Sequence, residues 1–307
     1  MPSPMSPQHP EPPAAFRIDK RQAGRAFSRA AASYHEAAVL QREVGQRLLD
    51  RLDYIRVKPH CVVDIGAGTG TLSGKLLTCY PRSHLVSLDL APAMLAHASL
   101  RRPLLQRLFP RQSFVCGDAE TLPLADNCSD LILSNLMLQW CNDTDRVFRE
   151  FRRILRPGGL LMFTSFGPDT LQELRSSWQT ANGYTHVNAF LDMHDIGDAL
   201  LREGFTAPVM DREEITLTYN EVRELMKDLK ALGAHNVTAG RARGLTGKGA
   251  LNKMLEAYEH YRSQGRLPAS YEIIYGHCWA PTIADHRSEP GTVRIPLSRL
   301  QGGKHHR

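Results

Sequence analysis

The stretch VVDIGAGTG, residues 62–70, joins a short apolar run to an acid and then gives three glycines in five positions. Gly66, Gly68 and Gly70 predict a tight turn between a strand and a helix that begins near Thr71. Because glycine has no Cβ, the backbone N–H groups of such a turn can approach a ligand closely. No Gly-Lys-Ser or Gly-Lys-Thr follows, which excludes a Walker phosphate loop. The stretch therefore predicts a different kind of cofactor site.

Apolar strand-like runs alternate with stretches of helical period after residue 60. This alternation predicts right-handed βαβ units, and hence an α/β fold of the Rossmann-like kind with a mostly parallel, twisted sheet and helices on both faces. The expected strands are 61–65, 84–89, 113–118, 130–135 and 159–166, with a closing strand at 270–280. Further helices are expected before the sheet, at 26–34 and 44–52, and after it, at 168–178, 193–205 and 222–232.

The chain of 307 residues has room for one large domain with additions. We expect this domain at 18–280, with a helical insertion at about 167–265 that covers the substrate. The polar tails, 1–17 and 281–307, are expected to be disordered.

Composition indicates an ordinary globular protein of a reducing compartment. There is no apolar run near the roughly 20 residues that a membrane span needs, and the first residues do not resemble a secretory signal. The six cysteines are scattered without a CxxC pair, which favours the cytoplasm. The net charge of +6 fits a solvated basic surface better than a nucleic-acid partner.

Asp89 lies about 20 residues after the glycine turn, where an acid holds the ribose hydroxyls of either a nicotinamide cofactor or S-adenosylmethionine (SAM). Three further features distinguish the two cofactors: Asp64 before the turn, GDAE at 117–120, and LRPGGLLMF at 155–163. Together they resemble the class I SAM-dependent methyltransferases. The resemblance covers roughly residues 55–166.

This resemblance implies a role for each acid. The acid that matches Asp64 lies beside the methionine end of SAM, Asp89 binds the ribose, and Asp118 with Ala119 contacts the adenine. The remaining cofactor contacts are expected from Gly66, Gly68, Gly70, Leu90 and Asn135. Taken singly, Asp64 could also be a buried capping acid, Asp89 an acid at the end of a strand, and Asp118 an acid in a turn.

The end of the fourth strand, SNLMLQW at 134–140, narrows the choice of methyl acceptor. It lacks the Pro-Pro-Tyr type of motif with which nucleic-acid amino-methylating enzymes of this fold grip their target. It also lacks the cluster of acids that a metal-assisted catechol enzyme needs, so no metal is expected.

The flanking segments resemble the BioC family of malonyl carrier-protein O-methyltransferases, over about residues 18–280. The segments that carry this resemblance are AFSRAAASYHEAAVLQREVGQRLL (26–49), HVNAFLDMHDIGDALLREGF (186–205), LKALGAHN (229–236), GRARGLT (240–246) and RLPASYEIIYG (266–276). The family implies SAM-dependent methylation of the free carboxylate of a malonyl thioester, carried by acyl carrier protein or coenzyme A. This reaction begins pimeloyl synthesis for biotin.

Such a carboxylate is already ionised at pH 7, so no general base is expected. Arg241 and Arg243 are the candidates for orienting it, Arg241 first, because a guanidinium can bind a carboxylate through two hydrogen bonds. Arg25 and Arg29 on the N-terminal helix are in reserve. Tyr34 is expected either to close the N-terminal helix over the cofactor, with its hydroxyl at the reacting carboxylate, or to pack on the apolar face of that helix. An acidic carrier protein would also match the basic surface.

Two other functions stay open. FGPDTLQEL (166–174) and LMKDLKALG (225–233) also resemble the methyltransferase-like assembly factors of respiratory complex I, some of which are thought to hydroxylate a protein arginine. A non-catalytic scaffold that retains SAM is the other alternative. HVNAF (186–190) and the segment from GAHN to GR (233–241) favour the carboxyl methyltransferase over the assembly factor.

Overall fold

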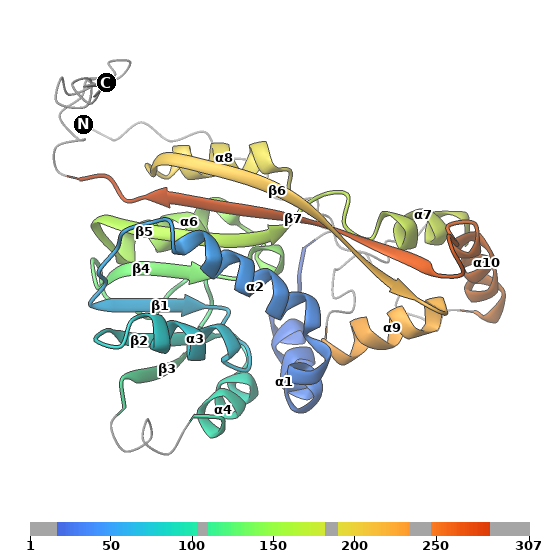
Figure 1. Cartoon of the computed structure of the whole chain (residues 1–307), viewed down its shortest axis with the longest axis horizontal. Coiled ribbons are helices and arrows are strands. Elements are labelled where there is room, and N and C mark those ends of the chain that lie inside the picture. Colours follow the sequence, from blue (N-terminus) through green and yellow to red (C-terminus); the bar gives the residue numbers. More distant parts are fainter. Residues whose placement is uncertain (1–16, 103–109, 182–189, 234–246, 283–307) are drawn as a thin grey trace, which may run out of the picture.

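The computed structural model describes residues 17–102, 110–181, 190–233 and 247–282. These residues form a seven-stranded sheet of order β3-β2-β1-β4-β5-β7-β6 (Figure 1). β7 is antiparallel to both of its neighbours, and the other described pairs are parallel. The strands are β1 Cys61–Ile65, β2 His84–Asp89, β3 Gln112–Cys116, β4 Ser129–Ser134, β5 Leu155–Phe166, β6 Thr206–Tyr219 and β7 Leu267–Trp279. The predicted fold class is confirmed.

Helices cover both faces of the sheet, as its apolar strands require. Successive strand residues point to opposite faces, so Val62 packs into the core beneath α2 and α3, whereas Val63 packs into the core beneath α6 and α8. The helices are α1 Lys20–Ala37, α2 Val39–Leu52, α3 Thr71–Cys79, α4 Pro92–Leu100, α6 Thr144–Ile154, α7 Gln172–Ala181, α8 Met193–Arg202, α9 Val222–Ala231 and α10 Lys248–Glu259, with a 3-10 turn, η2, at Leu138–Trp140. None of the described helices is long and apolar enough to cross a membrane.

The strands β6 and β7 form a long ribbon that extends beyond the rest of the sheet toward α7, α9 and α10 (Figure 1). The predicted helical insertion, 167–265, therefore needs a correction, because it contains the edge strand β6. Charged side chains break the strand pattern of β6, and two of them pair with α2: Arg47 with Glu213, and Arg51 with Asp211 at 2.8 Å. These long-range ion pairs leave no local signal for a strand.

The helix α1 lies beyond the carboxyl ends of β1 and β2, where the predicted cofactor loops meet (Figure 1). Its N-cap is Asp19, whose side chain accepts a hydrogen bond from Gln22 N at 3.0 Å. The helix packs against α4 and α9. The N-terminal segment is therefore part of the site wall.

Candidate functional site

The glycine turn between β1 and α3 has the conformation that its sequence predicts. Gly66 and Gly70 both have φ of +80°, a region that glycine occupies without a steric penalty. A Cβ added to Gly66 would lie 2.6 Å from Met137 Cγ, and one added to Gly70 would lie 2.8 Å from Ala98 Cβ. Neighbouring segments thus pack directly against the bare backbone of the turn.

Asp89, at the end of β2, holds this turn in place. Its Oδ2 accepts a hydrogen bond from Gly68 N and its Oδ1 one from Ala91 N, both at 2.8 Å. Desolvation raises the pKa of the Asp89 carboxyl, although the backbone N–H groups oppose this rise. An ionised carboxylate accepts about four hydrogen bonds, so acceptor positions remain on Asp89 for the hydroxyl groups of a ligand.

Asp64 lies in β1, directly before the turn, with 1% of its surface exposed. Burial raises the pKa of its carboxyl to about 7, and the charge of Asp89 adds to this shift. A hydrogen bond of 2.5 Å from Ser73 Oγ acts in the opposite direction. A cationic group bound nearby would favour the ionised form of this acid.

Asp118 follows β3 and forms the opposite end of the pocket. Its Oδ1 accepts from Lys20 Nζ at 2.8 Å, and the same ammonium lies 2.9 Å from Glu120 Oε1. Lys20 thereby connects the start of α1 to the turn that contains Asp118 and the buried Ala119. The sequence analysis missed Lys20, because nothing near it in the chain indicates a partner about a hundred residues away.

Aromatic side chains complete the pocket wall. The rings of Phe27 and Trp140 meet edge to face with centroids 4.8 Å apart. Tyr34 lines the pocket above Gly68, and burial together with the charge of Asp89 raises the pKa of its hydroxyl, which therefore stays protonated at neutral pH. Trp140 was also missed from sequence, since its position depends on α1.

The structure brings most of the predicted cofactor residues together. Gly66, Gly68, Asp89, Leu90, Asp118, Ala119, Asn135 and Tyr34 all line one pocket. A recess on the far side of the turn adds Asp64. Arg241 lies outside the described residues, and so does its alternative Arg243.

Asn135 lines this pocket, but its amide is engaged within the protein. Its Nδ2 donates to the main-chain oxygen of Gln41 at 2.9 Å, and its Oδ1 accepts from Thr164 Oγ1 at 2.8 Å. Asn135 therefore connects β4, α2 and β5. Its predicted contact with the cofactor stays a prediction.

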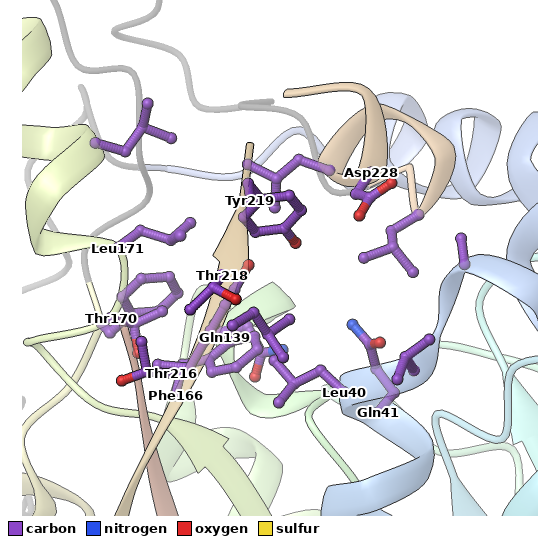
Figure 2. A pocket seen from close by; sticks show the side chains of 18 of the residues that line it. Leu40, Gln41, Gln139, Phe166, Thr170, Leu171, Thr216, Thr218, Tyr219 and Asp228 are labelled. Atoms are coloured by element: carbon purple, nitrogen blue, oxygen red, sulfur yellow. The ribbon is translucent and has the colours of Figure 1, made fainter. Parts of the chain in front are cut away.

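A second cavity of about 490 Å³ adjoins the first pocket, and we call it the arm cavity (Figure 2). Leu40 and Gln41 of α2 lie across it from Tyr219 and Asp228 (Figure 2). Trp140 lines both the arm cavity and the cofactor pocket. A molecule in the arm cavity would thus have one end at the cofactor.

The pocket around the glycine turn fits SAM on its own chemistry. Asp89 retains acceptor positions for ribose hydroxyls, and the buried acid Asp64 suits the cationic methionine end. Phe27, Leu90 and Met94 offer an apolar wall near Asp118, as an adenine ring requires. The residues present are therefore compatible with this cofactor.

Comparisons with known proteins agree with this assignment. A family model described as a methyltransferase domain matches residues 63–163. The malonyl-[acyl-carrier protein] O-methyltransferase of Nitrosospira multiformis is 52% identical across 90% of this chain and 94% of that protein. The chain belongs to the malonyl-[acyl-carrier protein] O-methyltransferase family. Another member, from Coxiella burnetii, is 40% identical across 94% of this chain and 98% of its own length.

Membership of the malonyl-[acyl-carrier protein] O-methyltransferase family confirms the predicted resemblance. Among solved structures, a putative methyltransferase from Bacillus halodurans matches with a TM-score of 0.56 over 78% of this chain and 99% of that chain. Because the two sequences are only 16% identical, this match shows a likeness of fold alone.

Proposed function

We propose that this protein transfers the methyl group of SAM to the free carboxylate of a malonyl thioester on acyl carrier protein or coenzyme A. The product is the methyl ester, which begins pimeloyl synthesis for biotin. The observation that carries the proposal is the 52% identity to a malonyl-[acyl-carrier protein] O-methyltransferase over 94% of that protein. The pocket around Asp89 carries the residues proposed to hold SAM, and the adjoining arm cavity of about 490 Å³ has room for part of the thioester substrate.

SAM supplies an electrophilic methyl group on a positively charged sulfur. The carboxylate oxygen forms a new O–CH3 bond as the C–S bond breaks, and the electron pair of that bond stays on sulfur. No proton is transferred, because the malonyl carboxylate is ionised at pH 7. The protein therefore has to hold the oxygen roughly 3 to 3.5 Å from the methyl carbon and to exclude water from it.

Tyr34 and Arg241 are proposed to do this positioning. Tyr34 lies beside the glycine turn and keeps its proton, so its hydroxyl can donate a hydrogen bond to the carboxylate. Arg241 is proposed to bind the other side of the carboxylate, on the basis of its sequence context. A contact that is too tight would stabilise the ground state and slow the transfer.

The proposed location is the cytoplasm. All six cysteines fall within the described residues, and each is a free thiol. Free thiols are typical of a reducing compartment. Cys278 is buried in the core, and burial raises the pKa of its thiol, which keeps it unreactive.

Rescue of biotin synthesis tests this function in cells. A bacterial strain without its own malonyl carboxyl methyltransferase is expected to grow without biotin when it produces this protein. The Asp89→Ala variant, produced at the same level, is expected to support growth less well, because it binds the methyl donor more weakly. Failure of the unaltered protein to support growth, although it is folded and binds SAM, would contradict the proposed function.

A further inference from the structure

The arm cavity has the size and position of a substrate site. Its volume of about 490 Å³ lies within the range of roughly 300 to 1,000 Å³ that is typical of small-molecule pockets. Trp140 separates it from the cofactor pocket, and Gln41 lines both the arm cavity and the recess beside Asp64. The cavity therefore adjoins the cofactor end of the site.

The described part of its wall offers no positive charge to an anionic occupant. Among the described lining residues there is no lysine or arginine, and Asp228 is the one charged side chain. Asp228 is exposed at the edge of the cavity and accepts a hydrogen bond from the hydroxyl of Tyr219. An uncharged chain fits this wall, whereas a carboxylate would be repelled from Asp228 toward the cofactor.

Two amides line this cavity, and the oxygen of each is buried without a partner. Gln139 Nε2 donates to the main-chain oxygen of Leu136 at 2.5 Å, which identifies the other amide atom as the oxygen. The Oε1 atoms of Gln139 and Gln41 are both shielded from solvent and have no hydrogen-bond partner. A buried acceptor without a donor is unfavourable, so a small rotation of the amide that brings its oxygen to a ligand N–H would be stabilising.

Apolar side chains and hydroxyl groups make up much of the rest of the wall. Leu40 and Leu171 line the cavity together with Thr216 and Thr218 (Figure 2), and Leu229 lines it as well. A pantetheine arm has a matching composition, because its secondary amides are separated by short methylene segments. Acyl carrier protein and coenzyme A present their acyl groups on this same arm.

We infer that the arm cavity binds the pantetheine arm and that Gln139 Oε1 accepts a hydrogen bond from an amide N–H of the arm. This inference rests on the proposed function and names the part of the substrate that the cavity recognises. The malonyl carboxylate then points past Trp140 toward the cofactor pocket. Gln139 acts as a specificity residue for the thioester arm, at a distance from the reacting atoms.

Two small substrates test the inference. The malonyl thioester of N-acetylcysteamine has one amide, and the malonyl thioester of pentanethiol has the same chain length without it. The unaltered protein is expected to prefer the amide substrate in kcat/KM by about 5- to 30-fold. Gln139→Leu should reduce this ratio to about one, while its affinity for SAM stays unchanged.

A matched control is Gln179→Leu, which makes the same substitution at an exposed position of α7 and should retain the original ratio. Gln139→Met provides a second variant of similar length if the leucine variant does not fold. An unchanged ratio in the folded Gln139 variant would overturn the inference. So would a loss of kcat/KM with malonyl carrier protein but not with malonyl-coenzyme A, because both present the same arm.

The outcomes separate the inference from the proposed function. If the unaltered protein methylates none of the malonyl thioesters, whether the two small ones, the carrier-protein one or the coenzyme A one, the proposed function is wrong. If it methylates them without any preference for the amide, only the role of Gln139 and its cavity is wrong.

Discussion

Asp89→Ala is expected to weaken the binding of SAM by about 10- to 150-fold, equivalent to about 1.5 to 3 kcal/mol. The variant removes the acceptors proposed for the ribose hydroxyls. It also removes the acceptors for Gly68 N and Ala91 N, which hold the glycine turn against β2. Calorimetric titration with SAM measures the change directly.

Asp195→Ala is the control for this substitution, because Asp195 is an exposed acid in the first turn of α8. Its affinity for SAM should equal that of the unaltered protein. Asp89→Asn keeps one acceptor oxygen and should fall between the two. An Asp89→Ala variant that folds and binds SAM within twofold of the unaltered protein would show that the ribose site lies elsewhere.

Gly66→Ala is expected to lower the free energy of unfolding by about 2 to 5 kcal/mol and to abolish measurable SAM binding. A φ of +80° costs a residue with a Cβ roughly 1 to 2 kcal/mol. The added methyl would also lie 2.6 Å from Met137 Cγ, and overpacking of this kind costs about 1 to 3 kcal/mol. Chemical denaturation and calorimetric titration provide the two measurements.

Gly74→Ala, eight positions along the chain, makes the same change in α3. Apart from its chain neighbours and the backbone of its own helix, no heavy atom lies within 4 Å of the added Cβ. Alanine favours a helix over glycine by about 0.5 to 1 kcal/mol, so this control should be slightly more stable and should bind SAM normally. Equal stability and affinity for the two variants would contradict the structural role of Gly66.

Local sequence patterns were sufficient to predict most of the sheet. The apolar run of β1, the glycine turn and Asp89 at the end of β2 are each encoded within a few residues. Such signals can be recognised from sequence because glycine, which lacks a side chain, favours tight turns, and apolar residues favour buried strands. The resemblance to class I methyltransferases assigned Asp64, Asp89 and Asp118 to one site, and parallel strands that end at one edge of a sheet bring such residues together.

Features that depend on distant partners were not predicted. The strand β6 carries adjacent charges, and its pairing with β7 and its ion pairs with α2 involve residues far away in the chain. Lys20 and Trp140 acquire their positions only when α1 lies over the pocket. The arm cavity is formed by α2, α7, α9 and the ribbon together, so no single segment indicates it.

The most direct test of carboxyl methyl transfer uses purified protein, SAM labelled on its methyl group, and malonyl acyl carrier protein, with the acyl product identified by mass. We predict a gain of one labelled methyl group on the malonyl group, in the form of a methyl ester. Alkaline hydrolysis of this ester should release the label as methanol. Absence of label from the malonyl group, in a preparation that binds SAM and with a carrier shown to be malonylated, would contradict the account.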